Sequence, residues 1–512
     1  MRGSPIVVIG AGIGGLSCAL SLAARGAAVT VLEAGSGPGG RMRETFPGGV
    51  PVDSGPTVLT LASVFHELFT QNGEQLAEHL TLDPLPVLAR HAWGPDERLD
   101  LYASHAASRQ AIADFAGARE AEGFDRFSRE ARALYQGLYG SFMRSQRPGV
   151  LQFAARIGPL GAFQLRAGQP FASLWSAVSR YFRDPRLRQL FGRYSTYVGS
   201  SPFASPAVLM LIAEVEMNGV FAVRGGMARL AGALAALAER RGVNFAYGQR
   251  VQHIHTEGCR VVSVECEDGS RHPASAVVYN GEPAALSAGR LGASVRSAVP
   301  APTPAEPSLS ALTFAWLART GDFPLAYHTV FFSSDYPREF HELFGEHRLP
   351  TEPTVYLCAQ DRAGSGADTA MSPGAAAAPP AERLFAIINA PALREASGPK
   401  PVATSPAHAE AELTRARAAG LALLERCGLR LGIEGEQRTG PADFARLFPG
   451  NGGAIYGQAC HGWQAPFQRP GARSAIPGLY LAGGGVHPGP GVPMVAISGQ
   501  LAADALLSDR GG

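Results

Sequence analysis

The sequence is poor in charged residues, has few cysteines and contains no long hydrophobic run. Six scattered cysteines without a C-x-x-C pair argue against a disulfide framework or a zinc site, and are typical of a reduced, cytosolic compartment. The net charge of +2 gives no reason to expect nucleic acid as a partner. The apolar stretch Pro206–Ala213 stops at Glu214, well short of the roughly 20 residues of a spanning helix. We therefore expect no membrane-spanning helix, although the protein can still lie on a membrane.

The hydrophobic content is high, at 46% of 512 residues against 17% charged. This composition excludes a disordered chain and predicts a large core, in two or three domains or in one domain with insertions. The N-terminal sequence MRGSPIVVIGAG has an apolar run too short for a signal peptide, so we expect a cytoplasmic location.

The chain opens with a strand, a glycine-rich turn, a helix and a second strand. The apolar run Pro5–Gly10 predicts a strand buried on both faces of a parallel sheet. Leu16–Gly26 predicts a helix and Ala27–Ala34 predicts the next strand, which ends at Glu33. Between them, Gly10–Gly15 match G-x-G-x-x-G. This order predicts a Rossmann-like dinucleotide-binding unit; the alternative is a glycine-rich turn that binds nothing.

Each part of this unit has a physical task. Gly10 permits the tight turn, Gly12 lets a pyrophosphate approach the backbone, and Gly15 allows close contact between helix and strand. The N-terminus of the helix attracts the phosphate charge. Glu33 is placed to accept hydrogen bonds from ribose hydroxyls, and its negative charge disfavours the 2′-phosphate of NADP.

The middle of the chain predicts helices first and then strands. Aromatic, leucine and arginine residues in Val150–Met217 predict a helical insertion, whose surface is either membrane-binding or an ordinary core with a solvated face. Phe221–Gly248 has helical periodicity, and Arg250–Gly281 alternates like a meander of strands. His253 and His255 share a face of one strand; we favour hydrogen-bonded histidines over a metal pair, because the sequence suggests no third ligand.

The remaining segments are a loop, a helix and a second strand–turn–helix unit. Gly364–Glu382 is of low complexity and predicts a loop, whereas His408–Gly428 predicts a helix. Leu481–Leu506 (LAGGGVHPGPGVPMVAISGQLAADAL) predicts a strand, a glycine turn and a helix that begins near Val492. The chain therefore has a glycine turn before a helix at both ends.

Two sets of motifs carry a family resemblance. Gly39-Gly40-Arg41 resembles an extension of the FAD-binding unit in flavoproteins with two dinucleotide-binding domains, which include amine oxidases, protoporphyrinogen oxidases and carotenoid desaturases. HPGPGVPMVAISG, together with Pro441–Gly457 and Gly462–Gly471, resembles bacterial carotenoid desaturases of the phytoene desaturase type. Within them, the chain is most similar to the 1-hydroxycarotenoid 3,4-desaturases (hydroxyneurosporene and methoxyneurosporene desaturases) of purple photosynthetic bacteria, over nearly its whole length.

The resemblance implies a mixed α/β fold. It is a Rossmann-like flavoprotein fold with two dinucleotide-binding domains, a substrate domain and a helical, membrane-facing insertion. The implied FAD-binding parts are residues 1–90, 221–290 and 471–512. The implied insertion is 91–220, and the implied substrate-binding domain is 291–470.

The resemblance also implies FAD as the cofactor and no metal. Arg41 then neutralises the pyrophosphate, and Asp53–Thr57 brings backbone near the flavin, whereas Arg43 is expected to be a solvated surface charge. The helix from Val492 directs its positive end toward the flavin ring. The implied cofactor-binding residues are Gly10, Ala11, Gly12, Gly14, Gly15, Glu33, Ala34, Gly40, Arg41, Thr57, Val251, Asn280, Gly484, Gly491, Val492 and Met494.

The implied reaction is desaturation of an apolar carotenoid. A hydride leaves an allylic carbon for the flavin, and the neighbouring carbon loses a proton. No catalytic residue is identified: His487 is the one weak candidate for a base, and a turn histidine that caps the helix is the alternative. A substrate dissolved in a bilayer implies peripheral association with the inner or photosynthetic membrane. Oxygen, a quinone and another carotenoid are the alternatives for the unknown electron acceptor.

Other functions fit the same fold. The enzyme alternatives are a phytoene desaturase and a flavin amine or protoporphyrinogen oxidase. The non-enzyme alternative is an isoprenoid-binding carrier of the Rab GDP-dissociation-inhibitor type, which does not use flavin. Intact Gly10, Gly12, Gly15, Glu33 and Arg41 argue against that carrier.

Overall fold

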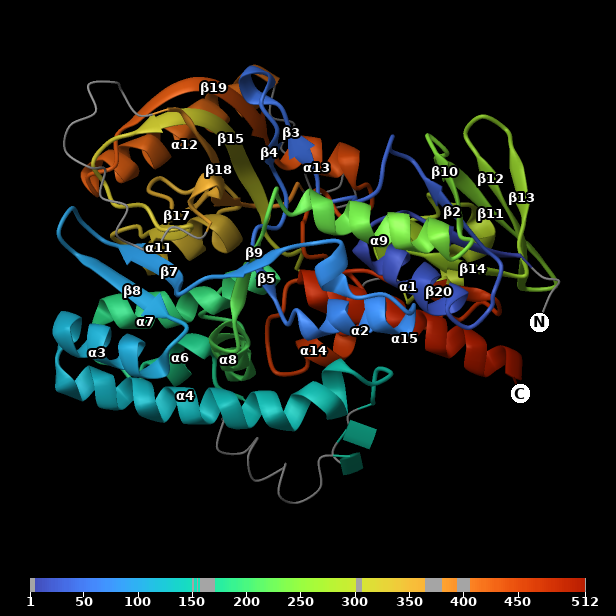
Figure 1. Cartoon of the computed structure of the whole chain (residues 1–512), viewed down its shortest axis with the longest axis horizontal. Helices are drawn as coiled ribbons and strands as arrows, with labels where there is room; N and C mark the ends of the chain where they lie inside the picture. The colour runs from blue at the N-terminus through green and yellow to red at the C-terminus, as the bar shows by residue number, and fades with distance from the viewer. Residues whose placement is uncertain are drawn as a thin grey trace.

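The protein is described by a computed structural model that covers residues 5–149, 152–153, 155–156, 171–300, 306–363, 380–393 and 406–511. It is elongated, with a parallel sheet at one end, a larger mixed sheet at the other and a layer of helices along one side (Figure 1). The predicted loop Gly364–Glu382 and the first part of the predicted insertion, around residues 157–170, lie largely outside the described residues.

The first sheet contains both strand–turn–helix units. Its five strands run parallel in the order β10-β2-β1-β14-β20. They are β1 (Ile6–Ile9), β2 (Val29–Glu33), β10 (Asn244–Tyr247), β14 (Ala276–Tyr279) and β20 (Leu479–Leu481). One sheet face is covered by α1 (Ile13–Ala23), α2 (Ser63–Gln71), α9 (Ala228–Arg240) and α15 (Val492–Gly511). Burial on both faces explains why β1 and β14 are continuous apolar runs.

The predicted opening unit is confirmed, with one difference. The helix α1 begins at Ile13 rather than at Leu16, because extended Gly12 (φ −71°, ψ 171°) is its N-cap and Gly14 and Gly15 form its first turn. The predicted periodic face of the helix in Phe221–Gly248 is also confirmed, since Leu230 and Leu234 of α9 are buried in the core.

The other face of the parallel sheet packs against an antiparallel meander. It consists of β11 (Val251–Glu257), β12 (Arg260–Cys266) and β13 (Arg271–Pro273), followed by α10 (Pro283–Ser287) and η6 (Ala293–Ala298). Ile254 and Val264 join Val7 and Val277 in one apolar cluster between the two sheets. The meander predicted for Arg250–Gly281 is thereby confirmed.

The second large sheet has seven strands in the order β19-β15-β18-β17-β16-β7-β8. The strands are β7 (Val87–Ala92), β8 (Arg98–Tyr102), β15 (Ser310–Thr320), β16 (His328–Phe331), β17 (Val355–Ala359), β18 (Glu382–Ala390) and β19 (Leu431–Thr439). Only the β16–β7 pair is parallel. An N-terminal hairpin, β7–β8, thus completes a sheet formed mainly by residues after 309.

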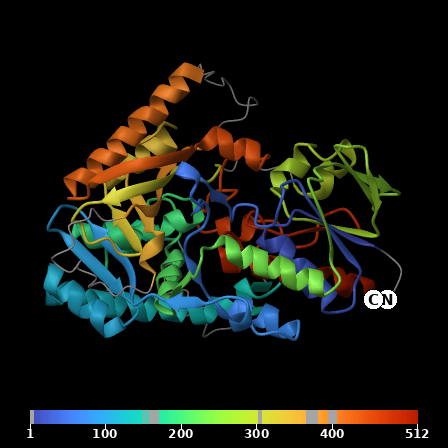
Figure 2. The same ribbon diagram turned by 45° about the horizontal axis from the view of Figure 1, so that its top comes forward.

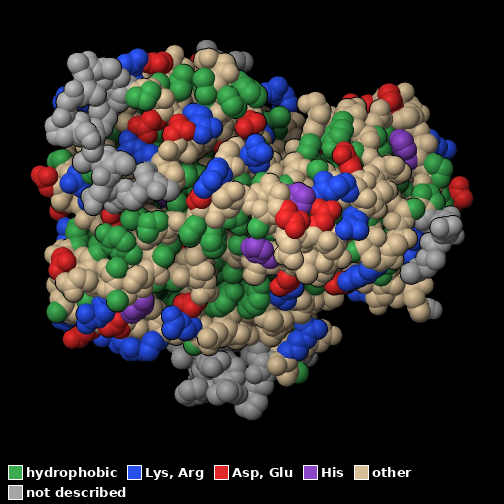
Figure 3. Space-filling model, in the orientation of Figure 1, with side chains coloured by type: hydrophobic (Ala, Val, Ile, Leu, Met, Phe, Trp, Pro, Cys, Tyr) green, Lys and Arg blue, Asp and Glu red, His purple; other side chains and the backbone are tan. Residues whose placement is uncertain are grey.

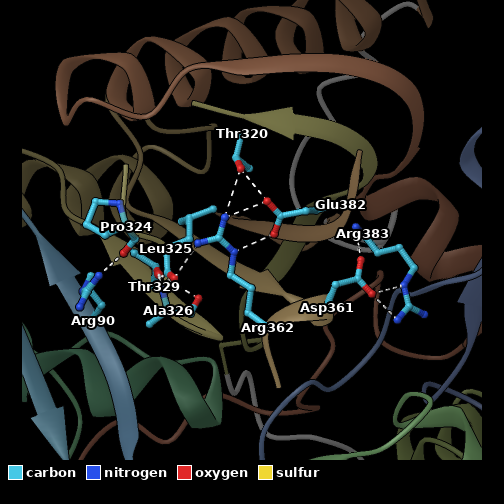
Figure 4. Close-up of polar contacts among 10 residues, drawn as sticks. All are labelled: Arg90, Thr320, Pro324, Leu325, Ala326, Thr329, Asp361, Arg362, Glu382 and Arg383. Carbon is cyan, nitrogen blue, oxygen red and sulfur yellow. Dashed lines mark hydrogen bonds and ion pairs between the residues drawn. The ribbon is translucent and has the colours of Figure 1, made fainter. Parts of the chain in front are cut away.

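Ion pairs hold the centre of this sheet. Arg362 of η8 (Gln360–Arg362) binds Glu382 and Thr320, and Arg383 binds Asp361, so that η8 is fixed to β18 from both sides (Figure 4). Arg90 of β7 donates to the carbonyl of Pro324 in the same view. These contacts fix the end of β17 relative to β18.

The two faces of the seven-stranded sheet have different partners. Alternate residues such as Phe331 and Leu357 pack against α12 (Pro406–Arg426), which lies across the sheet on the side away from the helical layer (Figure 2). The other face, with Val330 and Cys358, packs against the helical layer.

The helical layer is formed by the described residues between 105 and 217. Its elements are α3 (His105–Ala116), α4 (Ala118–Leu138), the π-helical turn η3 (Tyr139–Met143), α6 (Leu174–Val178), α7 (Pro185–Gly192), η4 (Arg193–Val198), η5 (Ala207–Met210) and α8 (Leu211–Met217). A three-stranded sheet, β5 (Leu59–Thr60), β9 (Val220–Val223) and β6 (Leu82–Pro84), connects this layer to the parallel sheet. No helix among the described residues combines the length and the apolarity needed to cross a membrane.

The short elements complete the connections. They are β3 (Glu44–Thr45), η1 (Pro47–Gly49), β4 (Val52–Asp53), η2 (Leu76–Glu78), α11 (Tyr336–Phe340), η7 (His341–Gly345), α13 (Pro441–Leu447) and α14 (Ala465–Gln468).

Candidate functional site: a glycine cradle between the two ends of the chain

The glycines after β1 are required by close backbone contacts. Gly10 has a left-handed backbone (φ 97°), and a Cβ on Gly15 would lie 2.0 Å from the carbonyl oxygen of Gly10. A Cβ on Gly499 of α15 would lie 2.1 Å from the carbonyl oxygen of Gly14. Glycine therefore lets α1 approach β1 on one side and α15 on the other.

Glu33 closes the loop that begins at Gly10. Its Oε2 accepts from the N–H of Ala11 at 2.6 Å, and its Oε1 accepts from the N–H of Gly35 at 2.7 Å. The side chain remains partly exposed at the end of β2, next to Ala34. A carboxylate with a free lone pair on each oxygen is thereby held at the edge of the glycine loop.

Asn280 joins the two ends of the chain. Its Nδ2 donates to the carbonyl of Gly10 at 3.3 Å, and its Oδ1 would be 2.6 Å from a Cβ on Gly14. The same oxygen lies 3.1 Å from the Cβ position of Gly483, in the second glycine turn. Both predicted glycine turns therefore meet at one amide side chain that follows β14.

Arg41 pairs with a carboxylate that the sequence did not single out. Its Nη2 lies 2.6 Å from Oε1 of Glu282, whose side chain is only 6% exposed, and its guanidinium stacks over the Phe448 ring at 4.9 Å. The buried Nε of Arg41 has no partner among the described residues. Gly40 (φ 60°) precedes it and contacts Gly12 through their backbones. The cation is thus fixed beside the loop with one donor unused.

Thr57 is joined to the seven-stranded sheet. Its hydroxyl lies 2.6 Å from the Tyr356 hydroxyl, which lies 2.6 Å from Nδ1 of His328. Burial, with repulsion from the charge of Arg193, lowers the pKa of His328 to about 3. The imidazole is therefore neutral at neutral pH, and its buried Nε2 has no partner in the described structure.

The remaining predicted cofactor-binding residues lie at the start of β11 and around the start of α15. Val251 begins β11 and is half-buried beside the apolar cluster under the parallel sheet. Gly491 (φ 110°) precedes α15, which begins at Val492 as predicted. Met494 packs against both the cluster that joins the parallel sheet to α1 and α15 and the cluster under the helical layer. The carbonyl of Gly484 accepts from Arg469 at 3.0 Å.

Two further charged residues, Arg469 and Asp53, hold distant backbone segments together, a role that the sequence did not indicate. Arg469 is buried and donates to the carbonyls of Tyr456, Gln458 and Gly484, while burial lowers its pKa. Asp53 accepts from Met227 and Ala228 and so caps α9, and burial is the main cause that raises its pKa. Both functions depend on contacts between segments far apart in the chain.

Three interpretations of single residues need correction or comment. Arg43 is not a solvated charge: it is half-buried, donates to Thr439 at 3.0 Å, and has a pKa lowered by burial. The Nε2 of His487 donates to two carbonyls of the helical layer, so this histidine neither caps α15 nor presents this nitrogen as a base. His255 binds Glu265 at 2.9 Å, and the described residues contain no group of three or more potential metal ligands.

The loop fits the pyrophosphate of a dinucleotide. No side chain caps the N-terminus of α1, and no acidic residue occupies its first turn, whereas Asp53 neutralises the N-terminus of α9. Open N–H groups at a helix start attract phosphate, and Arg41 adds an unused buried donor nearby. Glu33 is placed to accept hydrogen bonds from a ribose. The parallel sheet and this cradle together are typical of a dinucleotide-binding protein.

Comparison with known proteins places the chain more narrowly. The family model for flavin-containing amine oxidoreductases matches residues 13–386. Hydroxyneurosporene desaturase from Rubrivivax gelatinosus is 47% identical over 513 residues, which cover 99% of this chain and 94% of that protein. Phytoene dehydrogenase from Streptomyces griseus is 32% identical over 525 residues, covering 99% and 95%.

A solved structure shares the fold. Cyclohexylamine oxidase from Brevibacterium oxydans aligns with a TM-score of 0.58 at 16% identity, and the alignment covers 99% of this chain and 100% of that one. The chain therefore belongs to the flavin-containing amine oxidoreductase family, in the branch that holds the carotenoid desaturases. This membership confirms the predicted flavoprotein fold of mixed helices and sheets, the FAD cofactor and the oxidoreductase class. The membrane-facing character of the helical insertion stays a prediction.

Proposed function

We propose that the protein is an FAD-dependent carotenoid desaturase. It removes two hydrogens from C3 and C4 of a 1-hydroxylated acyclic carotenoid such as 1-hydroxyneurosporene. The observation that carries this proposal is the full-length similarity to hydroxyneurosporene desaturases, together with an intact glycine cradle. The weaker similarity to a phytoene dehydrogenase makes the early desaturase the second candidate.

The residues of the cradle would hold the cofactor. The start of α1 and Arg41 would bind the pyrophosphate, Glu33 would bind the ribose, and Thr57 and Met494 would contact the flavin ring. When bound, FAD would supply the flavin ring that accepts a hydride from the substrate.

The helical layer and the second face of the seven-stranded sheet form the apolar surroundings that a polyene needs. Phe385 and Val330 of the sheet share one cluster with Phe191 and Leu190 of α7. Such surroundings exclude water and favour a hydrocarbon over an amine, which requires polar or charged contacts. The conjugated polyene delocalises positive charge, so that no strong base is needed to take the proton from the second carbon.

An open groove supplies an entrance for the substrate. It has a volume of about 750 Å³ and is bordered by α2, by Leu61, by Phe221 of β9 and by Tyr135 of α4. Figure 3 shows hydrophobic side chains gathered over this area, between α2 and α8. Tyr135, which borders the groove, packs against both the cluster of the parallel sheet and α1 and the helical-layer cluster, so the groove lies at the boundary between these two clusters.

Peripheral membrane contact is part of this proposal. Phe171 is 79% exposed and Trp463 is 39% exposed, and their rings form an edge contact at 5.6 Å on the helical layer. Aromatic side chains of this kind insert at membrane interfaces. The proposed location is therefore the cytoplasmic surface of the inner or photosynthetic membrane.

The test is anaerobic reduction of the bound flavin. The purified holoenzyme is placed in liposomes with 1-hydroxyneurosporene in one sample and phytoene in another, and its visible spectrum is followed. We expect bleaching with the hydroxylated carotenoid. Bleaching with phytoene alone identifies an early desaturase, and bleaching with neither carotenoid contradicts the proposal.

A further inference from the structure

A cluster of buried polar groups lies between the seven-stranded sheet and the helical layer, in otherwise apolar surroundings. Arg193, the first residue of η4, is 7% exposed and forms no ion pair within the described part of the chain. His328 of β16 is 2% exposed and lies on the sheet face that meets the helices, since it alternates with Thr329 and shares the face of Val330. The two residues thus come from opposite sides of the interface between the sheet and the helices, and they lie near enough that the charge of Arg193 contributes to lowering the pKa of His328.

The nearest described counter-charge to Arg193 is Glu216, which the side chain of Tyr197 separates from the guanidinium. Its Nη1 is 3.5 Å from the Tyr197 hydroxyl, and its guanidinium carbon is 5.2 Å from the centre of that ring. The hydroxyls of Tyr197 and Tyr194 both donate to the buried carboxylate of Glu216. Tyrosine therefore separates the cation from the anion, and the guanidinium keeps donors that no carboxylate occupies.

Both sides of this interface have buried polar atoms without a hydrogen-bond partner among the described residues. The Nε of Arg193 and the Nε2 of His328 are buried without a hydrogen-bond partner in the described structure. The Nε2 of His91, on the neighbouring strand β7, is in the same state, because its Nδ1 bonds to the carbonyl of Leu99. Leaving such atoms buried is costly unless a ligand or water meets them.

A hydroxyl group matches this set of atoms. Arg193 can only donate, whereas a neutral histidine offers one donor and one acceptor. A hydroxyl accepts from the guanidinium through its oxygen and either donates to or accepts from an imidazole nitrogen. A carboxylate would lack the donor, and a hydrocarbon would satisfy neither atom.

The place of the cluster in the fold agrees with the short distance between the substrate hydroxyl and the carbons that react. In a 1-hydroxylated carotenoid, the hydroxyl oxygen lies within about 5 Å of C3 and C4, given carbon–carbon bonds of about 1.5 Å. A hydroxyl subsite must therefore lie beside the flavin. The chain of 2.6 Å contacts from Thr57 through Tyr356 to His328 connects this cluster to the FAD-binding segment.

We propose that Arg193 and His328 form the subsite that binds the tertiary hydroxyl of the substrate and so select hydroxylated carotenoids. Tyr356 is a positioning residue, because it holds the His328 ring through Nδ1. This inference rests on the proposed desaturase function and deepens it, since it assigns the substrate selectivity to named groups.

The test compares two polyenes that differ at the hydroxyl. The holoenzyme is assayed in liposomes by anaerobic flavin reduction with 1-hydroxyneurosporene and with 1,2-dihydroneurosporene, which lacks only the hydroxyl. The ratio of their second-order rate constants of flavin reduction measures selectivity. For Arg193→Met we expect this ratio to fall about 10- to 100-fold, because one charged hydrogen bond is lost. The loss should fall on the hydroxylated substrate, and Arg193→Lys should restore part of it.

Two further variants distinguish a loss of selectivity from a general effect of misfolding. His328→Phe should lower the same ratio, and Arg188→Met is the matched control, since Arg188 of α7 donates to the Phe182 carbonyl outside the cluster. FAD content and the melting temperature are measured for every variant. Selectivity lost while both are retained supports the subsite.

The contrary outcomes are distinct. If the variants lose activity equally with both carotenoids, the cluster is a water-filled structural network and the inference is wrong. An unchanged ratio, or a wild type that does not discriminate, also overturns it while the desaturase function stands. A wild-type flavin reduced by neither carotenoid overturns both proposals.

Discussion

His487 and Phe142 are joined twice, although 345 positions separate them in the sequence. The Nε2 of His487 donates to the Phe142 carbonyl at 2.9 Å, and the two rings form an edge contact at 4.7 Å. The same nitrogen lies 3.0 Å from the carbonyl of Ser145. Because both partners are carbonyls, Nε2 carries the proton. The contact fastens the turn before α15 to the end of the helical layer.

The first prediction concerns this contact. We expect His487→Ala to lower the free energy of unfolding by about 1–3 kcal/mol, because two buried carbonyls lose a donor. Turnover per bound flavin should stay close to that of the wild type, since the ring serves docking and not proton transfer. Denaturant unfolding and single-turnover flavin reduction measure the two effects. Complete loss of turnover in a folded, flavin-loaded variant would restore His487 as the base.

The second prediction is a dependence of stability on pH. Burial lowers the pKa of His487 to about 4, whereas an unfolded histidine titrates near 6.5. Between these values the unfolded chain binds a proton that the folded chain does not, so stability is full above about pH 6.5 and is lost as the pH falls toward 4. His487→Gln should reduce the slope of stability against pH by up to about 1.4 kcal/mol per unit.

Phe142→Leu is the control for this slope. It removes the ring contact but leaves the carbonyl and introduces no titrating group, so its slope between pH 6.5 and 5 should equal that of the wild type. Equal slopes for the wild type and His487→Gln would show that the imidazole is not held neutral.

The third prediction tests the glycine cradle. Gly15→Ala should abolish FAD binding or folding, because its Cβ would lie 2.0 Å from the Gly10 carbonyl oxygen. Gly232→Ala in α9 is the matched control: its Cβ meets nothing within 4 Å, so a gain of about 0.5–1 kcal/mol in stability is expected. The ratio of FAD to protein and the unfolding free energy are measured. Full FAD content in Gly15→Ala would refute the close approach.

The fourth prediction separates two neighbouring arginines. Arg41→Met should weaken FAD binding about 10- to 100-fold, because a charge-assisted contact to the pyrophosphate is lost. Arg43→Met should leave the affinity nearly unchanged, since Arg43 points to Thr439 of β19. Titration of apoprotein with FAD gives both constants. Equal losses would place both cations at the cofactor.

The fifth prediction concerns the membrane. The double variant Phe171→Ser, Trp463→Ser should sediment less with liposomes, because it removes the exposed aromatic pair. Phe46→Ser is the control, since this exposed ring lies next to β19, where the Phe46 N–H donates to Gln437. A wild type that stays in the supernatant would disprove the membrane contact.

The sequence by itself determined the two ends of the chain. Local patterns were sufficient there, because a buried parallel strand must be apolar and a glycine turn must precede each helix. The start of α15 at Val492 and the strand that ends at Glu33 follow from such patterns. The cofactor class followed from the same residues and from the family resemblance.

Only the tertiary structure decided how distant polar groups pair. Nothing near Arg41 in the sequence indicates Glu282, and nothing near Arg193 indicates His328, because burial and charge pairing depend on which chain segments meet. The position of β7 and β8 in the seven-stranded sheet likewise depends on a parallel pairing with β16, more than 200 residues further along. The apolar interface between the seven-stranded sheet and the helical layer is formed by such long-range contacts, so the sequence alone could not define it.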